Sequence, residues 1–404
     1  MRIAILTNEY PPNVYGGAGV HVEYLAKELA ALDRDHRIDV FSFGDQHIDD
    51  KNLHVRGVNP DSTIQTADPL HGKFLDTMLR DVHMSGLVEA AEIVHCHTWY
   101  SHFAGCLIRS LHNARLVLTT HSLEPHRPWK VEQLGSGYHA SSWIEKTAYQ
   151  NADGVIAVSE SMKRDVMEVY DVPEEIIAVI PNGIDPDEYR PIGEPDVLRL
   201  HGIDPERPFV LFVGRITRQK GIIHLVNAIP FLDGGMQVVL CAGAPDTAEI
   251  GKEMENAVQE ARRRGNHDII WISEMLPREQ VIALYSGADV FVCPSVYEPF
   301  GIINLEAMAC ETAVVASAVG GIPSIVVDGE TGLLVPFEAR GPVDFEPRDA
   351  DAFSQNLADA LNSLMKDPER SKEMGRRGRR RVLEQYSWRA VAQQTTSFYK
   401  KLLS

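Results

Sequence analysis

The sequence has no apolar run of membrane-spanning length, few cysteines and no excess of positive charge. Its formal net charge of −18 over 404 residues disfavours nucleic acid as a partner, because phosphates repel an acidic surface. The five cysteines are scattered and odd in number, so a disulfide framework is excluded and reduced thiols are indicated. We therefore expect a cytoplasmic protein without membrane insertion and without a nucleic-acid partner.

Several catalytic signatures are also missing. The sequence contains no Gly-x-Ser-x-Gly elbow, no Walker lysine loop and no Cys–His pairing for nucleophilic catalysis. His95 and His97 would share one face of a strand and suggest a metal pair. Only two ligands are local, however, and no further Cys or His pair with metal-ligand spacing supports them. The sequence predicts no metal site.

What the chain does contain is a regular alternation of short apolar runs with longer amphipathic segments. Apolar residues make up 44% and charged residues 24%, as in an ordinary globular protein. The alternation predicts an α/β protein with parallel sheets covered by helices. The predicted strands are Ile3–Leu6, Ile38–Ser42, Ile93–His97, Leu116–Thr120, Val155–Ser159, Ile176–Ile180, Phe209–Gly214, Val238–Gly243, Ile269–Ile272, Val290–Cys293, Ala313–Ser317 and Leu333–Val335.

The length of the chain exceeds what one core usually serves, so we expect two domains. A stretch rich in turn formers and charge, Pro181–Pro195, is the predicted linker. The first doubly wound domain would span residues 1–185 and the second residues 196–386, with the final helix 387–403 packing back on the first. Ligands of such folds bind at the carboxyl ends of the strands, so a cleft between the two sheets is expected. The oligomeric state is left open between a monomer and a homodimer.

The most informative segment follows the predicted strand Val290–Cys293. It forms a loop and then a helix, with Gly301 where the helix begins. Free N–H groups at the start of a helix bind anions, so a phosphate is the expected ligand. Glu298 in the loop and Glu306 in the helix could reach the sugar or the ribose attached to that phosphate.

Two cations follow the strand Phe209–Gly214. Arg215 offers a bidentate fork and Lys220 a point charge, and both could stabilise the charge on a departing diphosphate. The alternative is a solvated basic loop. The position at a strand end, in a strongly acidic chain, favours the functional reading.

The first domain carries its own candidate groups. Gly16 and Gly17 lie in a glycine-rich loop after the first strand and could approach a phosphate or a sugar, although the spacing is not that of a dinucleotide-binding motif. A flexible loop tip is the alternative. His121, just past a buried strand, is expected either to contact a sugar hydroxyl or to be a core histidine. Arg127 and Lys130 could form an anion clamp.

Taken together, these residues resemble the retaining glycosyltransferases of the GT-B type, family 4, over the whole chain. The features that carry the resemblance are the Gly16-Gly17 loop, Thr120-His121, Pro181-Asn-Gly-Ile-Asp185, Gly214-Arg215 with Lys220-Gly221, and the Glu298/Glu306 pair. Within the family, residues 9–21, 121–135 and 141–148 resemble the actinobacterial-type glycogen synthases, also described as α-maltose-1-phosphate synthases. That group uses ADP-glucose and glucose 1-phosphate.

The chain departs from the larger starch synthases at two motifs. Thr98 stands where they have an aspartate, and Val14-Tyr-Gly-Gly replaces their lysine-bearing loop. Both differences count against a long-glucan acceptor, and Arg127 with Lys130 would suit a phosphorylated acceptor instead.

The resemblance implies a role for each matched residue. The catalytic groups would be His121, Arg215, Lys220 and Glu298, with no protein nucleophile, no metal and no cofactor beyond the nucleotide sugar. The donor, ADP-glucose or UDP-glucose, would be bound by Gly17, Arg215, Lys220, Phe300, Gly301, Ile302 and Glu306. The acceptor would be bound by Gly16, Arg127 and Lys130.

The implied activity is glucosyl transfer to glucose 1-phosphate or to an α-1,4-glucan in glycogen biosynthesis. Transfer to another small or phosphorylated sugar is an alternative within the enzyme class. A sugar-nucleotide epimerase and a non-catalytic sugar-nucleotide sensor are alternatives from other classes. The epimerase needs no acceptor site, and a sensor has no need for groups that stabilise a transition state.

Overall fold

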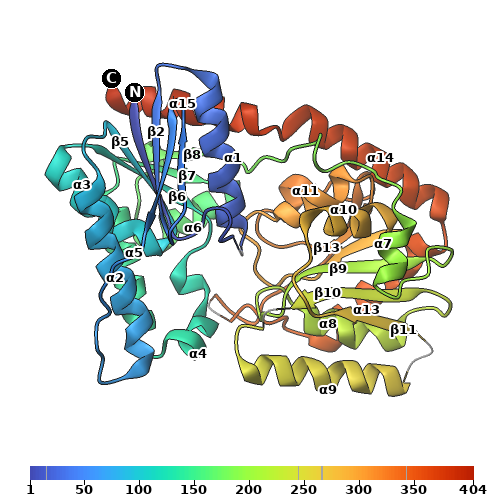
Figure 1. Ribbon diagram of the computed structural model, residues 1–404. Coiled ribbons are helices and arrows are strands. Elements are labelled where there is room, and N and C mark those ends of the chain that lie inside the picture. Colours follow the sequence, from blue (N-terminus) through green and yellow to red (C-terminus); the bar gives the residue numbers. More distant parts are fainter. Residues whose placement is uncertain (15, 244, 265–266, 343) are drawn as a thin grey trace. The chain divides into compact units, whose positions relative to one another are not determined.

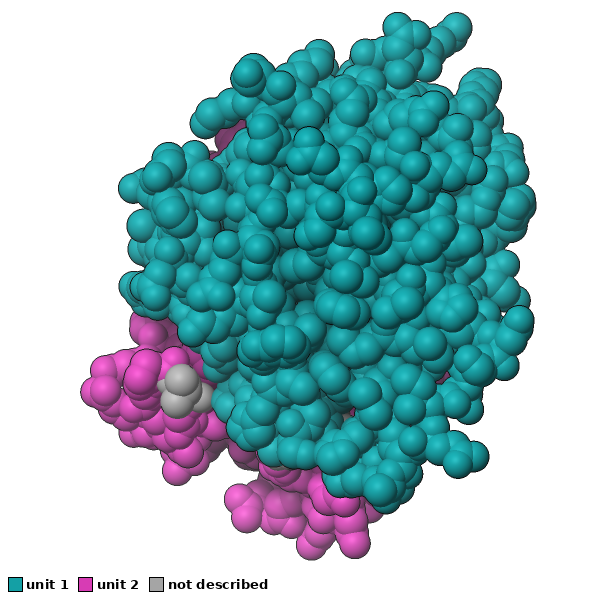
Figure 2. Space-filling model, turned by 90° about the vertical axis from the view of Figure 1, so that its left-hand side faces the viewer, with its two compact units in different colours: residues 1–183, 388–404 teal, residues 184–387 magenta. Residues whose placement is uncertain are grey.

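The computed structural model describes residues 1–14, 16–243, 245–264, 267–342 and 344–404. The chain divides into two compact units, shown in two colours in Figure 2. Unit 1 comprises Met1–Gly183 and Trp388–Ser404, and unit 2 comprises Ile184–Ser387. The first boundary falls inside the expected linker, two residues before the limit of 185 drawn from the sequence.

Unit 1 is built on an eight-stranded sheet with the strand order β3-β4-β2-β1-β5-β6-β7-β8 (Figure 1). All neighbouring strands are parallel except β3 and β4, which pair antiparallel. The strands are β1 (Arg2–Thr7), β2 (Arg37–Phe43), β3 (His47–Asp50), β4 (Leu53–Val58), β5 (Ile93–His97), β6 (Arg115–Thr120), β7 (Gly154–Ala157) and β8 (Ile177–Val179). The helices are α1 (Gly17–Leu32), α2 (Pro69–Leu87), α3 (His102–His112), α4 (Val131–Leu134), α5 (Gly137–Asn151), α6 (Glu160–Tyr170) and α15 (Trp388–Leu403).

Unit 2 holds a six-stranded parallel sheet with the order β11-β10-β9-β12-β13-β14. Its strands are β9 (Phe209–Arg215), β10 (Gln237–Gly243), β11 (Asp268–Ile272), β12 (Val290–Cys293), β13 (Ala313–Ser317) and β14 (Gly332–Val335). Its helices are α7 (Pro195–Leu200), α8 (Ile222–Ala228), α9 (Ala248–Arg264), α10 (Arg278–Gly287), α11 (Ile302–Ala309), α12 (Ile322–Ile325), α13 (Ala350–Met365) and α14 (Pro368–Gln385). The predicted α/β class with two doubly wound Rossmann-like sheets is confirmed.

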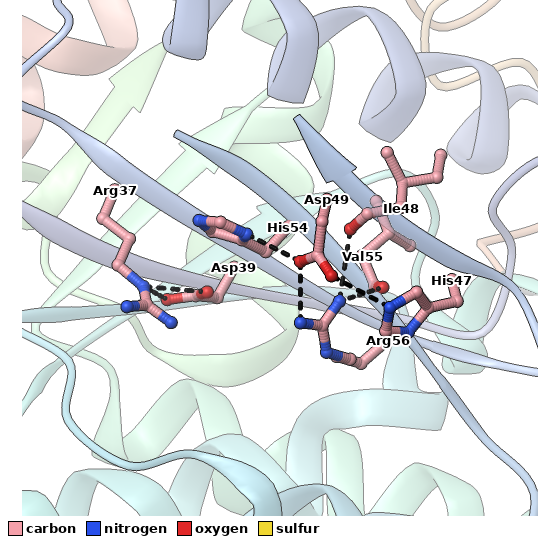
Figure 3. A network of polar contacts seen from close by, with 8 residues as sticks. All are labelled: Arg37, Asp39, His47, Ile48, Asp49, His54, Val55 and Arg56. Atoms are coloured by element: carbon pink, nitrogen blue, oxygen red, sulfur yellow. Dashed lines mark hydrogen bonds and ion pairs between the residues drawn. The ribbon is translucent and has the colours of Figure 1, made fainter. Parts of the chain in front are cut away.

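The β3–β4 hairpin at the edge of the first sheet was not predicted. All four residues of β3 are exposed, so no apolar run marks this strand in the sequence. Polar contacts hold the edge instead, and Asp49 accepts hydrogen bonds from His54 at 2.9 Å and from Arg56 at 2.7 Å (Figure 3). A charged edge strand of this kind discourages pairing with another chain.

The last helix belongs to the first unit. The buried residues Val391, Thr395 and Phe398 recur at helical spacing on α15. This face packs against α1, whose own buried stripe includes Val22, Leu25 and Leu29 (Figure 1). Residues near the C-terminus therefore complete the core that the N-terminal strands begin. None of the described helices combines the length and the apolar character that spanning a bilayer requires.

Candidate active site

In both sheets the candidate residues gather where the strand order reverses. In unit 2 the chain runs outward from β9 to β10 on one side and returns to β12 on the other, and in unit 1 β1 lies between β2 and β5 in the same way. The carboxyl ends of such neighbouring strands form the usual ligand site of doubly wound sheets. Arg215 ends β9, while His97 ends β5 and His121 follows β6 directly.

The central contact in unit 2 joins the two strand ends. Lys220 Nζ lies 2.7 Å from Glu298 Oε2, and Ser295 Oγ donates a hydrogen bond to the same oxygen at 3.0 Å. The side chains of Lys220 and Glu298 are 23% and 8% exposed, so the pair is largely shielded from water. Burial lowers the pKa of Lys220, but attraction to Glu298 outweighs it and leaves that pKa above its ordinary value. The ammonium group is therefore charged at neutral pH.

The backbone around this pair is tightly fitted. Gly221, directly after Lys220, has a φ of +60°, and a Cβ at this position would lie 2.0 Å from the carbonyl oxygen of Pro294. Val296 N–H donates to the carbonyl of Gln219 at 3.0 Å, which ties the loop after β9 to the loop after β12. Only glycine fits such a close approach at positive φ, so the sequence here positions Lys220.

The other predicted donor residues lie around the same strand ends. Arg215 pairs through Nη1 with Asp246 Oδ1 at 2.9 Å, and its side chain is 40% exposed. Gly301, with a φ of +106°, precedes α11, which begins at Ile302 as expected. Phe300 is buried against the ring of Tyr386.

Glu306 lies one turn into α11 and is held by tyrosines that the sequence did not single out. Tyr285 Oη donates to Glu306 Oε2 at 2.8 Å, and Tyr189 is a second hydrogen-bond donor to this carboxylate. Burial raises the pKa of Glu306, although these two hydrogen bonds oppose the shift. The carboxylate is thereby presented in a fixed orientation, as a group that recognises paired hydroxyls would need to be.

In unit 1 the glycine-rich loop is held by a hydrogen bond to a carboxylate of the same loop. Gly16 precedes α1, and its N–H donates to Glu9 Oε2 at 2.8 Å. A Cβ on Gly19 would lie 2.9 Å from the same carboxylate oxygen. The Gly16 N–H is therefore engaged by the chain's own carboxylate, rather than bare as the sequence suggested, while Gly17 opens the helix. Tyr15 lies outside the described residues.

His121 belongs to a group of buried histidines. Its Nε2 lies 2.9 Å from Nδ1 of His97, and its ring packs edge-on against His21 with 4.8 Å between centroids. His21 in turn bonds through Nδ1 to Asn182 Oδ1 at 2.6 Å. His21, His97 and Asn182 were missed as site residues, because they are distant in the sequence and only the folded structure brings them together. The Pro181-Asn-Gly segment was noticed only as a linker and a family feature.

These histidines are uncharged at neutral pH. Burial lowers the pKa of His21 to about 4, with the Asn182 hydrogen bond opposing the shift. Burial also holds the pKa values of His97 and His121 well below their ordinary range, and the neighbouring histidines add to the effect. A neutral imidazole can donate a hydrogen bond to a sugar hydroxyl or accept one from it, and it adds no charge to the site.

Thr98 marks strained backbone beside this group. Its φ of 67° and ψ of 159° belong to a region that β-branched residues avoid, at a cost of about 1–3 kcal/mol. Thr98 Oγ1 donates to Asn8 Oδ1 at 2.9 Å, linking the end of β5 to the end of β1. Strain of this kind is concentrated at functional sites.

Arg127 and Lys130 lie on the segment between β6 and α5. Arg127 Nη1 lies 3.5 Å from the buried carboxylate of Glu124, and its Nε–H is buried without a hydrogen-bond partner among the described residues. The Lys130 residue is 9% exposed and ends a single turn of 3₁₀ helix. Arg127 is thus partly neutralised, yet it keeps one unsatisfied donor.

The comparisons with known proteins cover the whole chain. A family model described as "Glycosyltransferase Family 4" matches residues 15–188, and one described as "Glycosyl transferases group 1" matches residues 196–381. The α-maltose-1-phosphate synthase of Mycolicibacterium smegmatis is 47% identical, with 100% of both chains covered. A glycogen synthase of Mycobacterium tuberculosis is 28% identical over 99% of this chain and 94% of its own. Among solved structures, the sucrose-phosphate synthase of Thermosynechococcus elongatus superposes with a TM-score of 0.79 at 28% identity, covering 100% of this chain and 99% of that one.

Proposed function

The chain belongs to glycosyltransferase family 4, and we propose that it is a retaining α-glucosyltransferase moving glucose from ADP-glucose to glucose 1-phosphate. Its hexosyltransferase character follows from the family and from the 47% identity to an α-maltose-1-phosphate synthase. The donor nucleotide, the acceptor and the stereochemical course are the parts that we add. The disaccharide phosphate product would serve glycogen biosynthesis in the cytoplasm.

The observation that carries the proposal is the group of charged side chains at the ends of β9 and β12. Lys220, in the loop after β9, is fixed beside Glu298, and Arg215 is the last residue of β9 itself. The two cations would hold the diphosphate, helped by the N–H groups at the start of α11 near Gly301. Glu306, oriented by two tyrosines, would bind the ribose hydroxyls, and Phe300 and Ile302 would line the donor site.

The proposed reaction needs no protein nucleophile. The bond between C1 of glucose and the diphosphate oxygen breaks, and its electron pair leaves with the nucleoside diphosphate. A hydroxyl oxygen of the acceptor forms the new bond on the same face of the sugar, which retains the configuration. The acceptor's proton passes to the departing phosphate oxygen. Lys220 and Arg215 stabilise the charge that develops there, so no metal ion or other cofactor is required.

The acceptor is assigned to unit 1. The unsatisfied Nε–H of Arg127 is a donor that a phosphate oxygen would satisfy, and Lys130 supplies further positive charge nearby in the sequence. Gly17, at the start of α1, would approach the acceptor or the diphosphate by backbone, and Gly16 would do so once its N–H leaves Glu9. His121 would bond a hydroxyl of the transferred glucose. The names of two relatives, α-maltose-1-phosphate synthase and sucrose-phosphate synthase, describe phosphorylated products, which also favours a phosphorylated acceptor.

Product analysis with the purified protein tests the proposal directly. ADP-glucose or UDP-glucose is combined with either glucose 1-phosphate or glycogen, and products are identified by mass spectrometry and NMR. We expect an α-linked disaccharide phosphate from ADP-glucose and glucose 1-phosphate. Chain growth on glycogen alone would replace the small acceptor with a polymer, and conversion of the nucleotide sugar without any acceptor would favour the epimerase. Binding without turnover would favour a sensor. Sedimentation of the same preparation distinguishes a monomer from a homodimer.

A further inference from the structure

Three histidines from separate segments of unit 1 converge on one point. They are His21 on α1, His97 at the end of β5 and His121 after β6. One nitrogen from each ring lies within 4.8 Å of the corresponding nitrogens of the other two. Within the described residues this is the one group of three His, Cys, Asp or Glu side chains with such spacing. We call these residues the histidine triplet.

The hydrogen bonds of the histidine triplet leave two ring nitrogens without partners among the described residues. The Asn182 amide oxygen can only accept, so His21 must carry its proton on Nδ1 and present a lone pair on Nε2. That Nε2 is buried and has no partner among the described residues. His97 likewise has a buried Nε2 without a partner, while its Nδ1 shares one proton with His121. Buried nitrogens without partners are uncommon and call for an explanation.

The chemistry of this group fits a borderline transition metal. Three neutral imidazoles with one open position form a well-known zinc coordination set, and nitrogen donors do not favour magnesium or calcium. The bond from His21 Nδ1–H to Asn182 is the outer hydrogen bond that metal-binding histidines usually make. Zinc–nitrogen distances of about 2.0–2.1 Å require the rings to approach one another and the bond between His97 and His121 to open.

We propose that the histidine triplet binds one zinc ion, with three imidazole nitrogens as protein ligands and water in the fourth position. His121 is the partly exposed member and gives the ion a route from the surface. Binding would take the Nε2 of His121 and hold its ring. Zinc would therefore inhibit glucosyl transfer, a consequence that rests on the function proposed above.

Cobalt and zinc binding to the full-length protein test the site without using activity. Co²⁺ in a site of three imidazoles absorbs visible light, and we expect one equivalent to produce this band and Zn²⁺ to remove it. His21→Gln should weaken Co²⁺ binding at least 100-fold, and Asn182→Ala, which keeps all three ligands, about 10-fold. His102→Gln is the matched control, because His102 is also a buried histidine of unit 1 but lies outside the triplet. It should bind Co²⁺ as the wild type does.

Anomalous diffraction from zinc-soaked wild-type crystals covers the case in which a variant does not fold. Anomalous density between the three rings supports the proposal, and zinc bound only elsewhere overturns it. Unchanged Co²⁺ binding in a folded His21→Gln variant would also overturn it. Transfer activity that persists when the site is saturated with zinc would remove the inhibitory role alone. Metal binding to the triplet in a protein whose metal-free form shows no transfer activity would instead contradict the proposed function and leave the site intact.

Discussion

At the residue scale, the positive charge of Lys220 interacts with two negative groups. It neutralises the buried carboxylate of Glu298 at 2.7 Å, and in the proposed reaction it also faces the departing diphosphate. Because the negative charge on the leaving oxygen grows as the C1–O bond breaks, the contribution of Lys220 is larger in the transition state than in the bound substrate. This difference distinguishes catalysis from binding.

Replacement of this lysine should therefore slow turnover more than it weakens binding. We expect Lys220→Ala to lower kcat about 10²–10³-fold, the usual effect of removing one group that stabilises a developing anion, with a smaller change in nucleotide affinity. Steady-state kinetics and calorimetric titration with ADP measure the two effects separately.

Arg218→Ala is the matched control for this prediction. Arg218 lies in the same loop, but its side chain is 33% exposed and it pairs with Glu253 on the surface. Its loss should leave kcat nearly unchanged. Equal losses of turnover and affinity in Lys220→Ala would reduce the role of this lysine to binding.

His102 provides a second test at this scale, one that concerns stability rather than catalysis. Both of its ring nitrogens are buried without partners among the described residues, and burial lowers its pKa to about 3. The folded protein keeps this ring neutral, whereas the unfolded chain takes up a proton below about pH 6.5. The histidine therefore reduces stability progressively as the pH falls from 6.5 toward 3.

His102→Gln should make the stability less dependent on pH. Between pH 4.5 and 6, we expect the slope of the unfolding free energy against pH to become shallower by about 1 kcal/mol per pH unit. Urea unfolding at several pH values measures the slope, which is independent of any constant cost of the substitution. His83→Gln, at an exposed position of α2, is the control. The same slope in wild type and His102→Gln would show that the ring is protonated in the folded state.

Residue types and their places after strands could be read from the sequence, but contacts between distant segments could not. Lys220 and Glu298 were singled out separately, since each follows an apolar run, yet their ion pair depends on β9 and β12 being neighbours. The histidine triplet could not be read from the sequence for the same reason. Spacing rules compare residues close in the chain and found His95 with His97, whereas the structure groups His97 with His21 and His121.

At the scale of elements, the position of the loops that carry Lys220 and Glu298 depends on close backbone contact. Gly221 combines a φ of +60° with a Cβ position only 2.0 Å from the Pro294 carbonyl oxygen. Gly202 offers a comparison, because it has a φ of +77° but open space around the same position. The two glycines separate the cost of a left-handed backbone from the cost of displacing a neighbouring loop.

Alanine at the two glycines should consequently have unequal effects. Gly202→Ala should cost about 1 kcal/mol of stability, from backbone strain alone. Gly221→Ala must also displace Pro294 and the loop that carries Glu298, so we expect a loss of about 3 kcal/mol and a clear fall in kcat. Thermal unfolding and kinetics on both variants provide the measurement. Similar stabilities for the two variants would mean that the loop after β12 yields easily.

Strands with apolar runs were predictable, and the exposed edge strand β3 was not. The run Val290–Cys293 is β12 to the residue, and Ile93–His97 is β5. In contrast β3, with the sequence His-Ile-Asp-Asp, forms through pairing with β4 and through the contacts of Asp49 rather than through burial. Local patterns report burial well, but they carry little information on strands held at an edge by charge.

At the scale of the whole molecule, the first unit depends on the last 17 residues, Trp388–Ser404. Tyr399 is fully buried and bonds His95 Nδ1 at 2.6 Å, and the ring of Trp388 contacts the ring of His21. Each large buried side chain of this helix contributes about 1.5–3 kcal/mol. Together they approach the entire stability of a typical domain, about 5–15 kcal/mol.

Truncation after Ser387 should unfold unit 1 and spare unit 2. We expect limited proteolysis with mass spectrometry to show rapid cleavage throughout residues 1–183 and protection of residues 184–387. A chain that ends at Leu402 lacks only two exposed residues and should resemble the full-length protein. Protection of both units after the longer truncation would show that α15 is dispensable for the first core.

The discontinuous first unit has a consequence for how the protein is made. Its sheet leaves the ribosome early, but the helix that covers α1 is translated only after the whole of unit 2. At about 5–20 residues per second, synthesis of the intervening 204 residues, Ile184–Ser387, takes roughly 10–40 s. During that time the apolar surfaces of the nascent N-terminal unit lack their cover, and unit 2 has all of its residues before unit 1 does. We therefore expect unit 2 to complete its fold first, and the unfinished first unit to be the part of the nascent chain most in need of a chaperone.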